Sequence, residues 1–166
     1  MPISIKYRYA LENGRNAQQI KNLLTSNDFN LGWNFQVCDR RNIVSFETLP
    51  NTSSDNNIDT YIFDANMYRN PLYKACMVDQ TKYVGRWNKV EELCELYSAD
   101  DEVIDKEELM SIISYIDADP DKCVARRFTG GDMLEVGTSA WYLCEQKGGY
   151  FGLGNAVDSP WGIIPI

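Results

Sequence analysis

The sequence has no histidine among its 166 residues. Imidazole is the commonest general base of enzymes that use a nucleophile, so this absence excludes a Ser-His-Asp triad and a Cys-His pair. It also excludes a histidine-ligated metal and a side chain whose ordinary pKa lies near neutrality. No other catalytic signature stands out. The sequence therefore favours a protein that binds over one that catalyses, and it predicts no catalytic residue.

Cysteines at metal-binding or disulfide spacing are also missing. The five cysteines are odd in number and widely spread, and no two of them form a CxxC motif. This pattern indicates neither a zinc site nor a disulfide framework. No metal or cofactor is predicted.

Long apolar runs are absent as well. No stretch approaches the roughly 20 apolar residues that span a bilayer, and the first ten residues lack the apolar core of a signal peptide. The chain is therefore expected to be cytoplasmic, with no membrane partner. A pI near 4.5 argues against a protein whose whole surface holds nucleic acid, so no direct nucleic-acid partner is expected.

Hydrophobic periodicity predicts an α+β fold. Apolar and polar residues alternate over 3–11, which is typical of a half-buried strand. Ile20, Leu23 and Leu24 then repeat at helical spacing behind the capping residue Asn16, which predicts one N-terminal helix over 17–26. A hairpin is expected over 35–46, a flexible polar loop over 50–57, and strands over 61–63, 72–78, 123–125, 133–136, 141–144 and 150–153, the last two joined by a turn at 147–149.

Two further helices have the clearest patterns. Asn88 is expected to cap the first, and Asp105 the second, where Glu108 completes a capping box. Their apolar stripes are Val90, Leu93, Cys94 and Tyr97 in the first helix, and Leu109, Ile112, Ile113 and Ile116 in the second. The short linker between them predicts an αα-hairpin. The whole chain, 1–166, is expected to be a single domain in which this hairpin and the N-terminal helix pack beside a largely antiparallel twisted sheet.

Negative charge is concentrated in the same part of the chain. Residues 91–121 hold twelve of the 24 acidic residues but only one basic residue, Lys106. A block of like charge this dense is self-repelling, which is typical of a solvated face or of a surface offered to a cationic partner. Nine carboxylates are expected on one end and one outer side of the hairpin: Glu91, Glu92, Glu95, Asp100, Asp101, Glu102, Asp105, Glu107 and Glu108.

These nine residues lead to the main functional hypothesis. Carboxylates spaced like the phosphates of a duplex occupy a basic nucleic-acid channel through the same attraction that draws DNA. The sequence thus predicts a non-enzymatic binding protein, an acidic inhibitor that occludes a basic site on a nuclease or another nucleic-acid-binding protein. Phage counter-defence proteins, which include anti-CRISPR and anti-restriction inhibitors, and toxin-immunity proteins are the settings that fit. The competing interpretation is a solubilising face, because carboxylates also favour helix N-termini.

Two alternatives remain open. The first is a small hydrolase or transferase that uses Asp117, Asp119 and Asp121 on a metal, or Arg126 and Arg127 on a phosphorylated substrate. Both motifs are incomplete, and a turn explains each of them more simply. The second alternative is a structural assembly subunit whose acidic side meets a basic neighbour.

Overall fold

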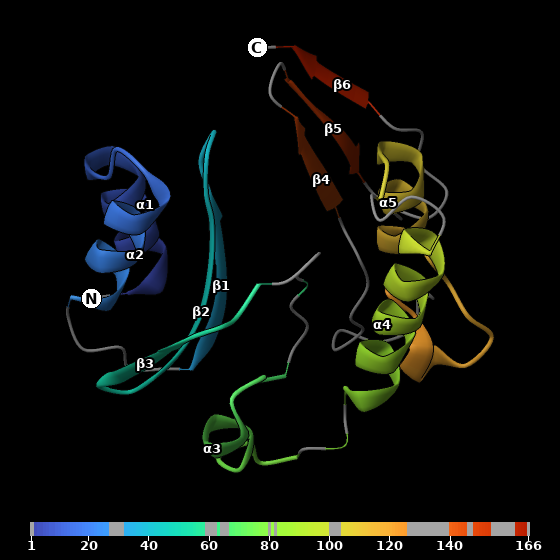
Figure 1. The fold of residues 1–166 in the computed structure, drawn as a ribbon, viewed down its shortest axis with the longest axis horizontal. Coiled ribbons are helices and arrows are strands. Elements are labelled where there is room, and N and C mark those ends of the chain that lie inside the picture. Colours follow the sequence, from blue (N-terminus) through green and yellow to red (C-terminus); the bar gives the residue numbers. More distant parts are fainter. Residues whose placement is uncertain are drawn as a thin grey trace. The chain divides into compact units, whose positions relative to one another are not determined.

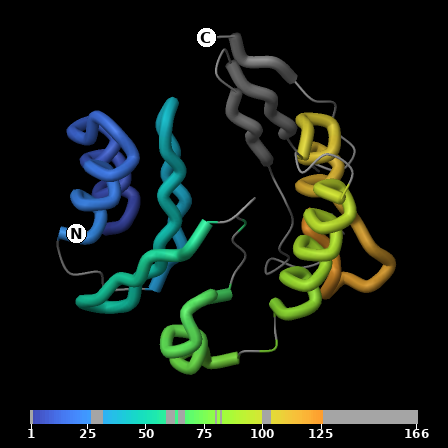
Figure 2. Tube along the Cα trace, in the orientation of Figure 1, coloured from blue at the N-terminus to red at the C-terminus, as the bar shows by residue number. Residues whose placement is uncertain are grey.

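A computed structural model of the chain describes residues 2–26, 32–58, 63, 67–79, 81, 83–99 and 104–125, together with the backbone of strands at 140–145, 148–153 and 162–165. The chain divides into two compact units, Met1–Thr81 and Lys82–Ile166 (Figures 1 and 2). Each contains helices and antiparallel strands, so the α+β class is confirmed. Two compact units can still belong to one folding domain, and the single-domain expectation stays a prediction.

The first unit is built around a three-stranded antiparallel sheet. Its elements are α1 (Ile3–Asn13), α2 (Ala17–Thr25), β1 (Trp33–Cys38), β2 (Ile43–Leu49), β3 (Thr52–Asp55) and α3 (Pro71–Lys74), and the strand order is β1-β2-β3. The predicted hairpin is present as β1 and β2, which pair from Trp33↔Thr48 to Cys38↔Ile43. Asn16 caps α2, as predicted, by accepting a hydrogen bond from the backbone N–H of Gln19 at 2.9 Å.

Helices α1 and α2 cover one face of this sheet (Figure 1). The core between them consists of Ala10, Leu24, Phe35 and Phe46, all almost fully buried. The rings of Phe35 and Phe46 stack with their centroids 4.8 Å apart. Because aromatic side chains bury large apolar areas, this stack is the main hydrophobic anchor of the first unit.

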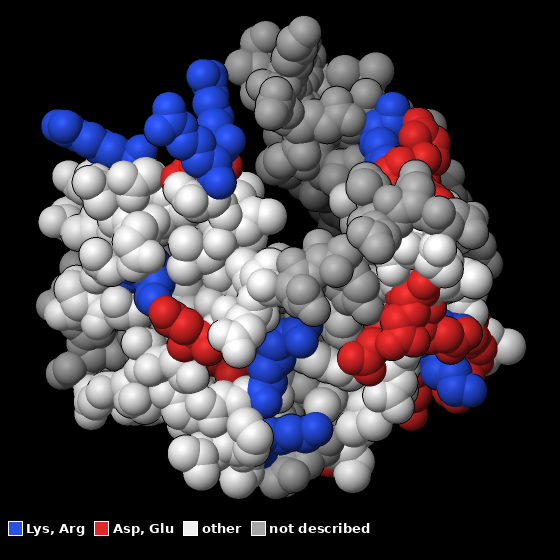
Figure 3. Space-filling view, viewed as in Figure 1, with Lys and Arg blue, Asp and Glu red and all other residues white. Residues whose placement is uncertain are grey.

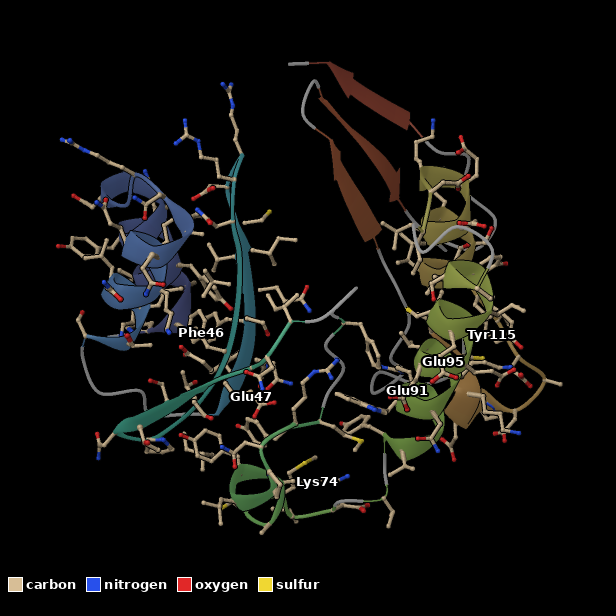
Figure 4. All side chains as sticks on the ribbon, viewed as in Figure 1. Phe46, Glu47, Lys74, Glu91, Glu95 and Tyr115 are labelled. Atoms are coloured by element: carbon tan, nitrogen blue, oxygen red, sulfur yellow. The ribbon has the colours of Figure 1, made fainter. Side chains whose placement is uncertain are left out.

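The opposite face of β2 is also buried. Four consecutive residues, Ser45 to Thr48, are each at most 2% exposed, although successive side chains of a strand point to opposite faces. Figure 4 shows Phe46 on the side of the helices and Glu47 on the other side of the strand. There the segment 67–73 covers the sheet, and the Tyr68 hydroxyl donates to the carbonyl of Thr48 at 3.1 Å. β2 is therefore a central strand between two layers.

Residues 3–11 form helix α1, so the predicted first strand is wrong. The helix buries Lys6 and Ala10 and half-buries Ile3 and Tyr7, a stripe at positions i, i+3, i+4 and i+7. A lysine in that stripe interrupts its apolar character, and the remaining residues then alternate in the manner of a strand. The first unit accordingly has two N-terminal helices where one was predicted.

Two more predictions in this unit are wrong. The polar segment 50–57 contains β3, which pairs with β2 after a two-residue turn in which Pro50 is followed by Asn51 at φ 64°. Proline followed by a residue of positive φ suits a tight turn, and asparagine tolerates that conformation. In the predicted strand 72–78, Pro71–Lys74 is a helix, because Asn70 caps it through the N–H of Leu72 and Pro71 takes the first helical position. The predicted strand at 61–63 lies, apart from Phe63, outside the described residues.

The second unit contains α4 (Val84–Ser98), α5 (Lys106–Ile113), a 3-10 turn η1 (Pro120–Lys122) and a second antiparallel sheet, β4 (Ala140–Glu145), β5 (Gly148–Leu153) and β6 (Gly162–Pro165). β4 and β5 confirm the predicted C-terminal hairpin. The predicted strand at 123–125 is instead the buried turn after η1, and 133–136 lies outside the described residues. The described strands thus form two small sheets where one was expected.

Helix α4 begins four residues before the predicted cap. Asn88 lies inside the helix, and Tyr83 is the capping residue. Gly85 allows the first turn of the helix to approach Asp121 closely, because a Cβ at this position would stand 2.7 Å from the Asp121 carbonyl oxygen. The helix thereby packs closely against η1, and the guanidinium of Arg86 donates to the carbonyl of Cys123 at 2.9 Å. Among the described helices of both units, none is long and apolar enough to cross a membrane.

Candidate acidic partner-binding face

The excess negative charge lies entirely in the second unit. The first unit carries eight acidic and eight basic residues, whereas the second carries sixteen acidic and eight basic residues. Figure 3 shows a dense group of acidic side chains over the region of α4. The second unit therefore accounts for the net charge of −8 and is the part of the chain whose field attracts cations.

The outer side of α4 carries three exposed carboxylates, Glu91, Glu92 and Glu95. They are exposed because the buried stripe of α4, Val90, Leu93 and Cys94, occupies the opposite side, as predicted. Glu91 and Glu95 are one helical turn apart and project from the same side of the helix (Figure 4). Among the described residues, neither of these two carboxylates has an ion-pair partner.

Glu92 differs from its two neighbours because Lys89 neutralises it. The ammonium of Lys89 lies 2.8 Å from the Glu92 carboxylate, and this hydrogen bond raises the pKa of Lys89. The same ammonium stands 5.1 Å from the centre of the Tyr115 ring. Sequence reasoning missed this contact because Lys89 precedes the acidic segment, and a base three residues before Glu92 was the pattern that would have found it.

The carboxylates at the start of α5 stabilise the helix itself. Asp105 accepts from the N–H of Glu108 at 2.8 Å, and Glu108 accepts from the N–H of Asp105 at 2.9 Å, so the predicted capping box is confirmed. Glu107 pairs with Lys106 at 3.0 Å. A hydrogen bond from a backbone N–H leaves the charge of the carboxylate in place, so Asp105 and Glu108 still contribute to the field of this face. Asp100, Asp101 and Glu102 lie outside the described residues.

The carboxylates of Asp117 and Asp119 cap two successive turns. Asp117 accepts from the N–H of Asp119 at 2.9 Å, and Asp119 accepts from the N–H of Asp121 at 3.0 Å. Lys122 lies 3.5 Å from Asp119. No group of three or more acidic or cysteine side chains within the described ranges is arranged to hold a metal ion. Arg126 and Arg127 lie outside those ranges.

Tyr115 ties the first of these turns to α4. Its hydroxyl donates to the Asp117 carboxylate at 2.8 Å, while its ring carries the Lys89 ammonium. The N–H of Asp119, followed by the Tyr115 hydroxyl, lowers the pKa of Asp117 from its ordinary value of 3.8. The same hydrogen bond raises the pKa of Tyr115. The turn is thus held by an ionised carboxylate.

Acidification is expected to loosen this turn. Because the pKa of Asp117 is lower in the folded state, its contribution to stability is complete well above pH 3.8 and is lost as the pH falls through the lowered value. Carboxyl titration by NMR should therefore place the midpoint for Asp117 below 3.8. Tyr115→Phe should raise that midpoint but leave it below 3.8, because the N–H of Asp119, the larger cause, remains. A wild-type midpoint at or above 3.8 would contradict this account.

No protein-family model matches the chain, and comparisons with curated proteins and with solved structures return no match. The arrangement of the described residues is therefore the basis for assigning a function.

Proposed function

We propose that this chain is a binding protein whose acidic α4–α5 face occludes a basic site on a nucleic-acid-binding protein, most concretely a nuclease. The observation that carries the proposal is the pair of exposed carboxylates Glu91 and Glu95, which have no ion-pair partner in the described part of a unit with a charge of −8. A face selected for stability alone would normally place bases between its acids, since like charges one turn apart repel. The partner that suits this face is a positively charged protein surface.

The paired carboxylates strengthen the same face. Glu92 and Glu107 make ion pairs with lysines, but their side chains are 66% and 72% exposed. Ion pairs at the surface contribute only about 0–1 kcal/mol, and the exposed carboxylate of each pair stays accessible to an arginine of a partner. Charge-assisted contacts of this kind increase the association rate and depend strongly on salt.

Leu96 gives the face an apolar contact as well. It is 63% exposed and follows Glu95 directly on α4. Interface centres combine apolar contact with a charged surround, so a partner surface that places basic residues around an apolar spot fits this part of α4. Glu91, Glu95 and Leu96 are the residues of α4 that we expect to contact the partner.

Reversing two of these charges is expected to abolish partner binding. The double variant Glu91→Lys, Glu95→Lys should lose at least about tenfold in affinity, or about 1.4 kcal/mol, because like charges then face each other across the interface. Proteins retained from the native host lysate at low salt would be eluted in a salt gradient and compared for wild type and variant. Both side chains are exposed, so the fold should change little.

A matched control separates position from total charge. Glu12→Lys, Asp55→Lys changes the net charge equally but lies in the first unit, on exposed residues that pair with Arg8 and Lys21. It should leave the retained proteins unchanged. Duplex DNA should release them better than simple salt of equal ionic strength, because it competes for the same basic site. Retention that is the same for both double variants, or that DNA does not reverse, would contradict the proposal.

A further inference from the structure

An open groove of about 470 Å³ runs along β1 in the first unit. It is lined by Tyr7 and Leu11 of α1, Ile20 and Leu24 of α2, and the five consecutive residues 34–38 of β1. Neighbouring residues of a strand point to opposite faces, so a groove that touches five in a row follows the edge of the strand rather than one face of the sheet. Within the described sheet, β1 is one of the two edge strands.

The lining of the groove is mostly apolar, and basic turns lie just beyond its Cys38 end. There the turn between α1 and α2 meets the turn between β1 and β2, because Asp39 accepts from the N–H of Ala17 at 2.9 Å. The other oxygen of Asp39 accepts from two N–H groups of its own turn, those of Arg41 at 2.7 Å and Asn42 at 2.9 Å. The Asp39 carboxylate is thus occupied by backbone donors, and those donors lower its pKa.

Three arginines project from the joined turns. Arg15 lies in the first turn, Arg40 and Arg41 lie in the second, and all three are exposed. None of the three forms an ion pair with another residue in the described part of the chain. Figure 3 shows basic side chains projecting from this end of the first unit. Arg40 and Arg41 are two and three residues beyond Cys38, the last residue that lines the groove.

We propose that this groove binds an extended acidic peptide segment of a partner protein, which lies along the edge of β1. Its apolar side chains would occupy the lining formed by α1 and α2, and its carboxylates would pair with the arginines at the basic end. Addition of a strand to a sheet edge is a recurrent mode of peptide recognition, in which side-chain pockets supply specificity. Guanidinium groups add selectivity because they bind carboxylates through two parallel hydrogen bonds. The site is separate from the acidic face and does not depend on its function.

A displayed library of random decapeptides, selected on the full-length protein, tests the proposal. Enriched peptides should contain alternating apolar residues and a cluster of Asp or Glu at one end. Arg40→Glu, Arg41→Glu should weaken binding of an enriched peptide at least about tenfold, whereas Arg40→Lys, Arg41→Lys should retain most of it. Leu11→Glu, which places a charge in the groove, should also abolish binding. Leu72→Glu is its control, because Leu72 is 76% exposed and lies outside the groove.

The chain contains its own reporter of occupancy. Cys38 and Cys76 are both exposed, but only Cys38 lines the groove. At ten times its Kd, an enriched peptide should slow maleimide labelling of Cys38 about tenfold and leave Cys76 unaffected. The proposal would be overturned if no peptide were enriched or if the enriched peptides had no acidic bias. It would also be overturned if the peptide changed the labelling rates of Cys38 and Cys76 by the same factor. Protection of Cys38 that rises with protein concentration and without peptide would assign the groove to a second copy and overturn it too.

Discussion

Glu47→Ala is expected to lower the free energy of unfolding of the first unit by roughly 3–5 kcal/mol. The Glu47 side chain is fully buried, and its two oxygens accept from the backbone N–H groups of Arg69 and Asn70, the second at 2.9 Å. Alanine would leave both partly buried donors without an acceptor, each at a cost of about 1–3 kcal/mol. The carboxylate thus holds the segment before α3 against β2. Backbone-to-backbone hydrogen bonds usually make such a connection.

Amide hydrogen exchange over residues 67–73 measures this effect directly, because it reports on the covering segment. Exchange there should accelerate more than anywhere else in the first unit. Glu47→Gln keeps the shape but replaces one acceptor with a donor, so it should also destabilise the segment. Glu12→Ala is the exposed control and should change stability by less than about 0.5 kcal/mol. Unchanged protection of the 67–73 amides in Glu47→Ala would show that the segment is held by other contacts.

Phe46→Ala should cost a similar amount, about 3–5 kcal/mol, through a different mechanism. Phe46 is fully buried and stacks on Phe35 on the opposite face of β2. Removing the ring leaves a cavity, and the surrounding helices and strands relax only partly to fill it. Protection should therefore fall first in α1 and α2, whereas Glu47→Ala affects the other layer.

Urea unfolding of the Phe46 variants measures how much each substitution lowers the free energy of unfolding. Phe46→Leu retains much of the apolar volume and should cost about half as much or less. Tyr9→Ala serves as the surface control, because Tyr9 is 48% exposed on α1. Equal destabilisation by the leucine and alanine variants would contradict a cavity mechanism.

Local rules predicted the parts of this fold that depend on neighbours in the sequence. The caps Asn16 and Asp105, the turn at 39–42 and the stripe of α4 each involve residues within about one or two helical turns. Helix α1 was missed because its buried stripe includes Lys6, and periodicity analysis treats every lysine as solvent-facing. A buried polar residue is the point at which such patterns fail.

The features that the sequence did not predict depend on contacts between residues far apart in the chain. Among the described strands, β3 pairs only with β2, and its polar sequence Thr-Ser-Ser-Asp has no alternation of apolar and polar residues that would predict a strand. The sequence pattern suggests that Glu47 is a strand residue that faces solvent. Its hydrogen-bond donors nevertheless come from residues more than 20 positions later in the chain. Propensity and spacing contain no information about such partners.

The sequence likewise predicted some features of the acidic face and missed others. The exposure of Glu91 and Glu95 follows from the position of the apolar stripe, and the sequence contained that information. The pairing of Glu92 was missed although the sequence contains its signal, because Lys89 lies three residues earlier and just outside the acidic segment. The groove along β1 was not anticipated at all, since it requires the packing of two helices against a strand edge.

The two-sided burial of β2 has a consequence for synthesis. Folding of the first unit is incomplete until Arg69 and Asn70 have left the ribosome, because until then the Glu47 carboxylate lacks its donors. The carboxylates of α4 and α5 emerge from the ribosome after that point. N-terminal units generally fold first during synthesis. The acidic residues of the second unit therefore emerge only after the neutral first unit has folded.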